Sequence, residues 1–203
     1  MTNFFLVMLA LGATKNVATA AELQAAISSA VANDEMVLAD GRYDFTASPS
    51  CNASGTAALP ITVRAANRLK ARIRFNTVEG FKVNGPYWRF DRLDVVGICP
   101  VDSDCEHAFH VSGRATGFQL LRSRIADFNA QLKVNASPAA DGGYDIPNQG
   151  LIEGNELFDS HTRNTGNPTT KLNIDTGDDW VIRGNFIHDF HKGLPDNVSY
   201  ACS

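Results

Sequence analysis

The fold of this chain is decided by the stretch LIEGNELFD, Leu151–Asp159, which is echoed thirty residues later by VIRGNFIHD, Val181–Asp189. A weaker copy, LLRSRIAD, occupies Leu120–Asp127, and a fainter one, FDRLDV, occupies Phe90–Val95. Self-similarity at a fixed period indicates that one supersecondary unit is stacked several times. The repeat therefore determines the architecture more firmly than any catalytic motif in the sequence.

A second motif precedes each copy of the repeat. It has the pattern apolar, polar, apolar, polar, small, and it occurs at Phe81–Gly85, Phe109–Gly113, Leu132–Ala136 and Leu172–Thr176. Alternating apolar and polar residues predict half-buried β-strands. After the third motif, a polar insertion rich in Gly, Asp and Pro runs from Ser137 to Gln149. We expect each copy to form one coil of a parallel solenoid whose equivalent strands stack in register.

Upstream of the repeat, a helix-forming segment is followed by further strand-like segments. Ala21–Ala32 has apolar residues on one face of a helix, and Met36–Ala39, Ile61–Arg64 and Leu69–Phe75 are typical of strands. Short strands joined by small-residue corners exclude a doubly wound α/β fold, and a closed up-and-down barrel would not need such a repeat. We expect an all-β parallel β-helix whose short N-terminal helix caps the first coil and protects its open edge.

The length and net charge of the chain limit the classes of protein to which it can belong. The chain has 203 residues and a formal net charge of −4, so it can form one domain with a substantial core. A nucleic-acid binder would usually show a strong basic excess, so we expect no nucleic-acid partner. No segment reaches the roughly 18 apolar residues of a membrane span, so we expect no membrane partner. We expect a monomer.

The N-terminal segment differs in character from the rest. An unbroken apolar stretch, Phe4–Ala13, precedes Ala18-Thr19-Ala20, which has the small–x–small pattern of a signal-peptide cleavage site. Lys or Arg is missing before this stretch and Lys15 follows it, so a buried N-terminal helix or a wrongly assigned start stays open as an alternative. We expect a signal peptide over residues 1–20, a β-helix domain over 21–203, and a secreted or periplasmic protein.

Four cysteines are consistent with export, because disulfides persist in oxidising compartments. Cys99 and Cys105 bracket a polar loop at a spacing that closes easily into a bridge. Cys51 and Cys202 are harder to pair, because stacked coils would separate them by several layers. Four cysteines allow three connectivities, and the sequence does not choose among them. Without a Cys-x-x-Cys pair and matching histidine spacing, a zinc site is a poor interpretation.

The order of these segments resembles the right-handed parallel β-helix proteins of the pectin-lyase-like superfamily. A capping helix is followed by VLADGRYDF, ITVRA and FKVNGPYWRFDRLDVVG, and then by the LIEGN and VIRGN coils. The similarity is greatest to the secreted polysaccharide lyases of the chondroitinase B and alginate lyase kind, and it spans nearly the whole mature chain. Because the matching residues are architectural, the resemblance is specific for a right-handed parallel β-helix. It implies lyase activity only through the positions of residues along the coils.

The outward residues of the second motif are the most informative polar positions. Strands about 4.8 Å apart would spread four of them over roughly 15 Å, the scale of a few sugar units. The first outward positions are Lys82, His110, Lys133 and Asn173, and the second are Asn84, Ser112, Asn135 and Asp175. Basic members of this face would attract carboxylate or sulfate groups. We therefore expect an acidic polysaccharide as partner, bound by Lys82, Asn84, Lys133 and Asn173.

A second basic stripe lies on an earlier strand. Lys70, Arg72 and Arg74 alternate with apolar residues, which places them on one outward face. Arg72 and Arg74 are therefore further candidates for substrate binding, for the same reason of charge.

The resemblance also implies a mechanism. The lyases concerned cleave uronate chains by β-elimination, in which a cation neutralises the uronate carboxylate and a basic side chain removes the C5 proton. In those enzymes the cation is calcium, held by Asn and acidic residues of successive coils. Calcium prefers oxygen ligands, so the candidate ligands here are Asn135, Asn173 and Asp175. The candidate base is Lys133 or His110, if its pKa is lowered. The family's clustered acidic ligands, followed by its Lys and Arg, are missing from this sequence.

Two other functional interpretations stay open. A non-catalytic adhesin or surface module would use the same face for binding alone. A β-helix glycoside hydrolase would use Asp175, Asp178 and Asp179 as general acid and base. The Gly-His-Gly pattern of pectin hydrolases is absent, so a tight acidic turn is the simpler interpretation. His188 and His191 should face opposite ways on a strand, which favours a corner role over a metal site.

Several other polar and aromatic residues are predicted to be structural. Asn155 and Asn185 follow glycine at equivalent corners, where asparagine tolerates left-handed backbone and can hydrogen-bond along the stack. The same role is expected for the recurring corner residues Asp127, Asp159 and Asp189, and packing roles are expected for Trp88 and Trp180. The segment from Asn197 onward is typical of the opening of another coil, so we expect the β-helix to be truncated at its C-terminus.

Overall fold

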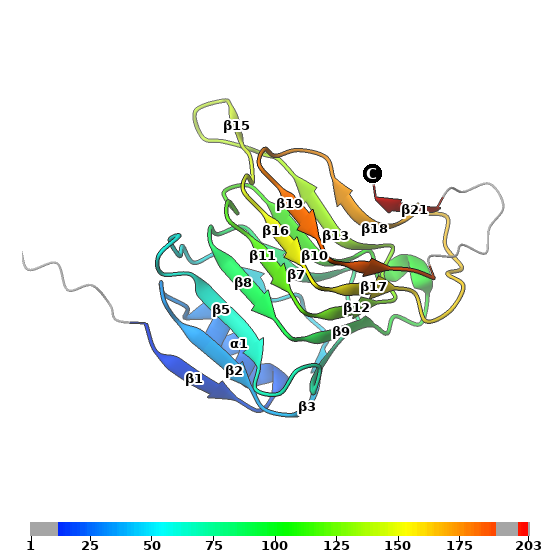
Figure 1. The fold of residues 1–203 in the computed structure, drawn as a ribbon, viewed down its shortest axis with the longest axis horizontal. Coiled ribbons are helices and arrows are strands. Elements are labelled where there is room, and N and C mark those ends of the chain that lie inside the picture. Colours follow the sequence, from blue (N-terminus) through cyan, green and yellow to red (C-terminus); the bar gives the residue numbers. More distant parts are fainter. Residues whose placement is uncertain (1–11, 190–198, 203) are drawn as a thin grey trace, which may run out of the picture.

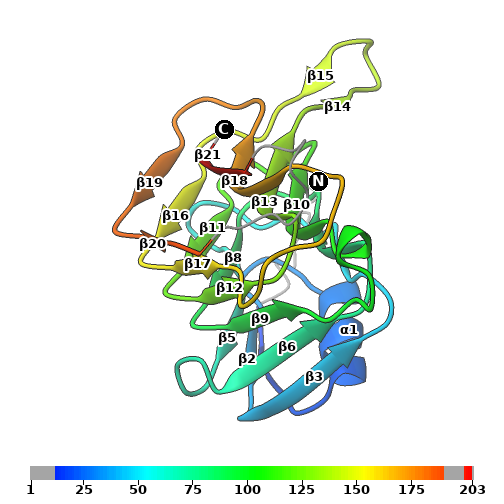
Figure 2. The ribbon, with the colours of Figure 1, turned by 90° about the vertical axis from the view of Figure 1, so that its right-hand side faces the viewer.

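The computed structural model describes residues 12–189 and, by their backbone alone, residues 199–202. Three parallel sheets wrap around one core (Figures 1 and 2). Sheet A contains β1 (Thr14–Val17), β2 (Glu35–Leu38), β5 (Ile61–Ala65), β8 (Trp88–Asp91), β11 (Gln119–Leu121), β16 (Leu151–Glu153) and β19 (Val181–Arg183). Sheet B contains β3 (Gly41–Phe45), β6 (Ala71–Phe75), β9 (Asp94–Gly97), β12 (Arg124–Ala126), β17 (Glu156–Phe158) and β20 (Phe186–Ile187). Sheet C contains β4 (Ser50–Cys51), β7 (Glu79–Val83), β10 (His107–Ser112), β13 (Ala130–Asn135), β18 (Thr169–Ile174) and β21 (Ser199–Cys202).

Successive coils of the chain pass through all three sheets in turn. Within each sheet, neighbouring strands are equivalent segments of successive coils, as in the order β8, β11, β16, β19 of sheet A. Ile152 of β16 pairs with Ile182 of β19, and Leu157 of β17 pairs with Ile187 of β20. The repeat found in the sequence is therefore the coil, and the predicted parallel β-helix is confirmed.

The corner between sheets A and B requires left-handed backbone. Gly154 and Gly184 follow β16 and β19 with φ of 69° and 63°. Arg122 holds the same conformation one coil earlier, with φ of 47°, although a side chain makes this conformation costly. The glycines of the LIEGN and VIRGN segments thus mark the corner itself.

An asparagine ladder follows this corner, as predicted. The side chain of Asn155 accepts the backbone N–H of Ser123 at 2.9 Å and donates to the carbonyl of Leu120 at 2.8 Å. Asn185 lies one coil later, where its side chain accepts the backbone N–H of Asn155 at 2.9 Å. Buried backbone groups must be paired with hydrogen-bond partners. At the turn, where the hydrogen bonds between strands stop, these amide side chains pair the backbone groups of successive coils.

Aromatic side chains fill the interior of the coils. Phe81 of β7 stacks on Phe109 of β10 with ring centroids 5.3 Å apart, and Phe75 of β6 meets Phe81 edge-on at 5.2 Å. Such pairs stabilise a core beyond the area they bury. Trp88 is also fully buried, and its indole N–H donates to the carbonyl of Ala53 at 2.8 Å. The predicted packing role of Trp88 is therefore confirmed.

Helix α1 (Ala20–Ser28) packs against the first coil and buries Leu23, Ala26 and Ile27. It begins with a capping box, in which Thr19 accepts the backbone N–H of Glu22 at 3.2 Å and Glu22 accepts the backbone N–H of Ala18 at 2.7 Å. The helix ends four residues before the predicted Ala32. Its last residue, Ser28, and the C-cap residue, Ser29, donate their hydroxyls to helix carbonyls, which weakens continuation of the helix.

Strand β1 precedes the helix and forms the outer edge of sheet A, where it pairs with β2. The ammonium of Lys15 lies 2.7 Å from the carboxylate of Asp34, which also accepts the backbone N–H of Ala13 at 2.8 Å. Val17 is buried. The expected signal peptide, residues 1–20, therefore overlaps the first coil from β1 onward.

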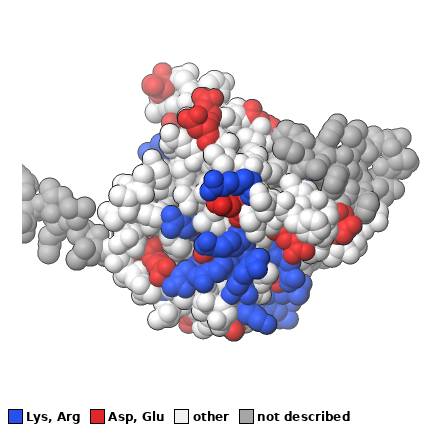
Figure 3. Space-filling view, viewed as in Figure 1, with Lys and Arg blue, Asp and Glu red and all other residues white. Residues whose placement is uncertain are grey.

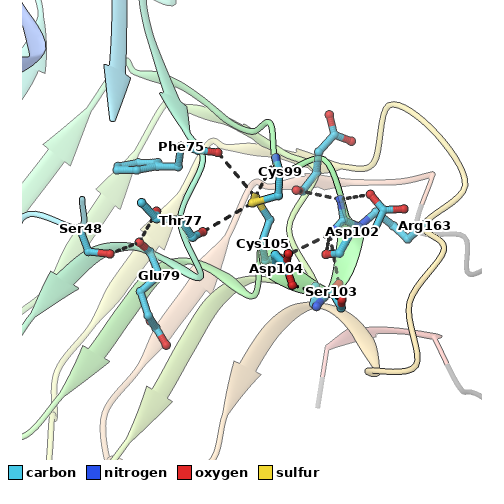
Figure 4. Close-up of a disulfide and its surroundings, with 12 residues drawn as sticks. Ser48, Phe75, Thr77, Glu79, Cys99, Asp102, Ser103, Asp104, Cys105 and Arg163 are labelled. Carbon is cyan, nitrogen blue, oxygen red and sulfur yellow. Dashed lines mark hydrogen bonds and ion pairs between the residues drawn. A yellow bond between two sulfur atoms is a disulfide. The ribbon is translucent and has the colours of Figure 1, made fainter. Parts of the chain in front are cut away.

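The disulfide Cys99–Cys105 is present, with Cα atoms 5.6 Å apart, as the loop spacing predicts (Figure 4). It encloses the 3₁₀ helix η1 (Asp102–Asp104) in the connection between β9 and β10. Cys51 is buried and free, and burial raises the pKa of its thiol. Cys51 and Cys202 lie in β4 and β21, the two outermost strands of sheet C, so their predicted separation by several layers is confirmed.

The polar insertion after β13 forms a hairpin that projects from the body of the solenoid (Figures 1 and 2). Its strands are β14 (Ser137–Pro138) and β15 (Tyr144–Asp145), which pair antiparallel. Among the described residues, α1 and η1 are both far too short to cross a lipid bilayer, and no membrane-spanning helix occurs.

Candidate functional site

The polar face predicted from the second motif lies on sheet C. The strand register places its first column in the order Lys82, His110, Lys133 and Asn173. The second column is held by side-chain contacts as well, because Ser112 donates to Asn84 at 2.8 Å and pairs with Asn135 in register. Both predicted columns are thus brought together on one sheet.

A carboxylate and two imidazoles converge at one edge of this face. Glu79 and His107 are paired residues at the starts of β7 and β10, and His110 follows on the same strand as His107. Oε1 of Glu79 lies 3.1 Å from Nδ1 of His107, and Oε2 lies 3.0 Å from Nδ1 of His110. The three potential ligand atoms all lie within 4.8 Å of one another. Glu79, His107 and His110, which we call the triad, therefore form a candidate metal-binding group.

The contacts within the triad favour an ionised carboxylate on Glu79 and a protonated imidazole on His110. Burial alone would raise the pKa of Glu79, but its contacts with His107 and His110 outweigh burial and lower this pKa to about 2. The contact with Glu79 raises the pKa of His110, against the opposing effects of burial and of the nearby Lys133 charge. A carboxylate that stays ionised thus stabilises positive charge on the imidazole side of the site.

The orientation of the His110 ring is fixed by Asn135. Nε2 of His110 lies 2.7 Å from Oδ1 of Asn135, and the amide nitrogen of Asn135 donates to the carbonyl of Ala136 at 2.9 Å. This second bond assigns the amide oxygen to the side of His110, so Nε2 carries the hydrogen and donates it. Nδ1 is consequently the nitrogen that faces Glu79.

Lys133 engages the oxygen atoms proposed for calcium. Its ammonium donates to Oδ1 of Asn173 at 3.1 Å and forms an ion pair with Asp175. The side-chain oxygen of Asn135, the third proposed ligand, accepts from His110 instead. Calcium needs six to eight oxygens converging on one point. The three residues do not fit that requirement here, because their oxygens face nitrogen donors of the protein.

Two hollows flank the triad on the surface of sheet C. One, of about 310 Å³, is lined by Glu79, Lys82, Asn84, His110 and Ser112. The other, of about 240 Å³, is lined by His107 and Asn173 together with loop residues that include Asn167. These hollows expose the triad and Lys82 at the surface of sheet C.

The loop over residues 160–168 is fastened by Arg163, which is almost fully buried. Its guanidinium donates to the carboxylate of Asp102 at 3.0 Å and to the carbonyl of Asp127 at 3.0 Å. Figure 4 shows Arg163 directed at the disulfide-bonded segment that carries Asp102. A further hollow of about 460 Å³ lies here, away from the polar face, and is lined by this segment and the loop. The disulfide and Arg163 thus hold the loop that supplies Asn167 to the site.

Arg72 and Arg74 lie on sheet B and are not brought to the polar face of sheet C. They belong to a basic face formed by outward residues of sheet B and its corner with sheet A, namely Arg42, Arg72, Arg74, Arg92, Arg122 and Arg124. Figure 3 shows Lys and Arg gathered toward the N-terminal coils on the side formed by sheets A and B. The molecule therefore carries two separate surfaces that suit an anionic partner.

Carboxylates partly neutralise the basic face. Arg124 holds Asp94 through two hydrogen bonds of 3.0 and 2.9 Å, and Arg74 lies 3.6 Å from Asp44. The basic face thus has part of its charge committed to internal ion pairs.

The acidic turn considered for a hydrolase connects β18 to β19. The backbone N–H of Asp178 donates to the side chain of Asn148 at 2.8 Å, and Asp179 adopts left-handed backbone with φ of 59°. Asp175 pairs with Lys133. His188 stacks on Phe186 with ring centroids 4.2 Å apart, and His191 lies outside the described residues.

Sequence reasoning missed Glu79 and His107. Both precede the alternating motifs that begin at Phe81 and Phe109, so they fall outside the pattern used to find the face. A signal was nevertheless present, because Glu79 and His107 each stand two residues before the first apolar residue of the motif. The repeat alignment, extended by two residues, would have placed them side by side.

Solved structures of similar fold are polysaccharide lyases. Alginate lyase from Paenibacillus sp. str. FPU-7 matches with a TM-score of 0.52 and 19% identity, over 92% of this chain and 85% of its own. Pectate lyase Pel9A matches with a TM-score of 0.64 and 13% identity, over 86% of this chain and 47% of its own. The PL6 family polysaccharide lyase Pedsa3628 from Pseudopedobacter saltans matches with a TM-score of 0.52 and 16% identity, over 82% of this chain and 40% of its own.

The chain has the fold of the β-helix polysaccharide lyases. The predicted resemblance to this superfamily is confirmed at the level of fold. The sequence matches no protein-family model, and no curated protein matches it significantly. The chain spans less than half the length of pectate lyase Pel9A and of Pedsa3628.

Proposed function

We propose that the polar face of sheet C binds an acidic polysaccharide and cleaves its uronate units by β-elimination. The observation that carries this proposal is the column of Lys82, His110 and Lys133 on three successive strands. These basic groups are spaced by about 4.8 Å, the distance between strands. This spacing is on the scale of one sugar unit, so the column suits a chain that carries one carboxylate per sugar. The lyase fold of the similar structures supports the same assignment.

In the proposed reaction, Lys133 is the base and His110 neutralises the uronate carboxylate. Positive charge beside the carboxylate makes the C5 proton more acidic. Lys133, an ammonium paired with Asp175 in the structure, would first release a proton to solvent and then remove the C5 proton as the free amine. The electron pair of the C5–H bond then forms the C4–C5 double bond while the C4–O bond breaks. The resulting Lys133 ammonium returns the proton to the leaving oxygen. Asn173 and Asp175 position this amine through the contacts seen in the structure.

The remaining predicted binding residues have defined parts in this proposal. Lys82 and Asn84 line the hollow next to His110 and would hold a neighbouring sugar unit. No step is assigned to calcium, because the oxygens of Asn135, Asn173 and Asp175 face Lys133 and His110. We also propose that the protein acts outside the cytoplasm as a monomer. The Cys99–Cys105 disulfide supports this location.

The test follows the ultraviolet absorbance of the unsaturated product during incubation with alginate, pectate and chondroitin sulfate. The wild type should generate absorbance with at least one of them, and Lys133→Ala should lower the rate about 10²- to 10⁴-fold. Lys70→Ala is the matched control, because it removes an exposed lysine from outside sheet C and should leave the rate unchanged. New reducing ends without absorbance would instead support the hydrolase that uses Asp175, Asp178 and Asp179.

A non-catalytic carbohydrate-binding protein is the second candidate, and the basic face favours it. Arg72 and Arg124 lie on neighbouring positions of sheet B around Asp94, away from the proposed catalytic column. Binding without turnover that is lost in the double variant Arg72→Gln/Arg124→Gln, and kept in Lys82→Gln, would establish this alternative. The lyase proposal predicts the opposite ranking, with Lys82→Gln the more damaging change.

A further inference from the structure

We propose that Glu79, His107 and His110 form a binding site for one divalent transition-metal ion of the Zn²⁺ class, with an open coordination position on the polar face of sheet C. The donor set consists of two imidazole nitrogens and one carboxylate oxygen. Such a set suits zinc and its first-row neighbours, whereas calcium and magnesium prefer oxygen ligands throughout.

The distances between the donor atoms agree with shared coordination. Two ligands at about 2.0–2.1 Å from a tetrahedral zinc lie roughly 3.3 Å from each other. The carboxylate oxygens of Glu79 lie 3.1 Å from Nδ1 of His107 and 3.0 Å from Nδ1 of His110. These contacts use two different oxygens of Glu79, and the three donors lie within 4.8 Å of one another, so side-chain movement would bring them around one ion.

One oxygen of the triad lacks an ordinary partner. Oε2 of Glu79 is buried and makes no hydrogen bond of acceptable geometry among the described residues, although Nδ1 of His110 is 3.0 Å away. Two ligands of one metal ion point at the ion and not at each other, which leaves them close but out of line. Among the described residues, the ion pair with His110 is the contact that offsets the burial of this oxygen, and a cation held between the two atoms would satisfy it more fully.

The second nitrogen of His110 is held as metal-binding histidines require. Ligating imidazoles usually donate their other ring N–H to a carbonyl or carboxylate, which fixes the ring and its tautomer. Nε2 of His110 does this toward Oδ1 of Asn135 at 2.7 Å. Asn135 is therefore a positioning residue for the metal site.

The site is half-open, as a reactive metal centre needs. The side chains of Glu79, His107 and His110 keep 17%, 18% and 28% of their surface exposed, so solvent reaches the donor atoms. Three protein ligands leave a fourth position for water or a substrate oxygen. If the proposed function holds, a uronate carboxylate lying beside Lys82 would take that position. The ion would then supply the neutralising charge in place of His110, because an imidazole that binds the ion through Nδ1 is neutral.

The experiment titrates tag-free, chelator-treated protein with ZnCl₂ by isothermal calorimetry, without polysaccharide. The wild type should bind one equivalent, and His107→Ala and Glu79→Gln should each weaken binding at least about tenfold. Asn135→Ala should weaken it about 10- to 100-fold, as expected for loss of the bond that orients a ligand. His188→Ala, an imidazole outside the triad, is the control and should bind like the wild type. Thermal unfolding without metal verifies that each variant is folded.

A second readout is the visible spectrum of the Co²⁺-loaded protein, which reports coordination by few ligands including nitrogen. Absence of saturable binding, unchanged binding in folded His107→Ala and Glu79→Gln, or displacement of the ion by an equal concentration of Ca²⁺ would each overturn the proposal. Because the titration contains no polysaccharide, its failure leaves the lyase assay with Lys133→Ala to be judged separately.

Discussion

Replacing Asn155 by alanine tests the stacking of coils at a single side chain. Asn155 is 2% exposed and serves two backbone groups of the preceding coil. The change removes the acceptor of the Ser123 N–H and the donor to the Leu120 carbonyl. Each buried backbone group left unpaired costs about 1–3 kcal/mol, so we expect the free energy of unfolding to fall by about 3 kcal/mol.

The assay is urea denaturation followed by tryptophan fluorescence, with thermal unfolding as a second measure. For a domain of this size, 1 kcal/mol corresponds to about 2–4 °C, so the melting temperature should fall by roughly 6–12 °C. Asn67→Ala is the matched control. Asn67 is exposed and contacts the carboxylate of Asp40 at the surface, so its loss should change stability by less than about 0.5 kcal/mol.

The reasoning fails if the two substitutions have the same effect. A loss of stability in Asn155→Ala within about 0.5 kcal/mol of that in Asn67→Ala would mean that the ladder does not hold the coils together. A change in the dependence of unfolding on urea concentration would point instead to an altered unfolded state.

Three further predictions concern the loop and the N-terminus. Arg163→Ala should lower the free energy of unfolding by about 3 kcal/mol in urea denaturation, because it leaves the partly buried Asp102 without its guanidinium. Burial would raise the pKa of Asp102, but the Asn164 N–H, His161 and Arg163 outweigh it and lower this pKa, so its ionised form stabilises the fold. That contribution is full above the ordinary pKa near 3.8 and is lost as pH falls through the lowered value, so the stability gap between the wild type and Asp102→Asn should shrink on acidification below that point. Mass spectrometry of exported protein should find β1 retained, since cleavage after Ala20 would remove the strand that pairs with β2; a mature chain starting at Ala21 would contradict this.

The architecture could be predicted from the sequence because the alignment of the repeats also gives the register of the strands that stack on one another. Once Ile152 and Ile182 are aligned, every residue of two coils has an assigned neighbour, and this placed Lys82, His110 and Lys133 in one column. The corner glycines and Asn155 were recognisable because their conformational needs are specific to residue type.

The parts that the sequence did not reveal depend on contacts between loops and corners. Glu79 and His107 lie just outside the alternating motif, so the apolar–polar alternation does not mark them and only an extension of the repeat alignment by two residues would have paired them. Arg163 is buried by a loop that returns to a segment about sixty residues earlier, and no local pattern encodes such a contact. Lys171 and Asp159 form a fully buried ion pair, although neither residue type is usually found in a core.

The sequence also suggested a signal peptide that reaches into the folded domain. The apolar stretch Phe4–Ala13 and the small residues Ala18–Ala20 predict a leader, whereas the segment between them, Thr14–Val17, forms the edge strand β1. In the structure, the capping box of Thr19 and Glu22 begins helix α1 within the residues assigned to the cleavage site, and the signal peptide stays a prediction.

The most direct test of the central claim is a crystal structure of the Lys133→Ala variant with a bound uronate trisaccharide. The polar face of sheet C should hold the sugar, with carboxylates next to His110 and Lys82 and a C5 atom facing the position vacated by the lysine amine. A trisaccharide bound instead across Arg72 and Arg124 on sheet B, with sheet C bare, would contradict the account.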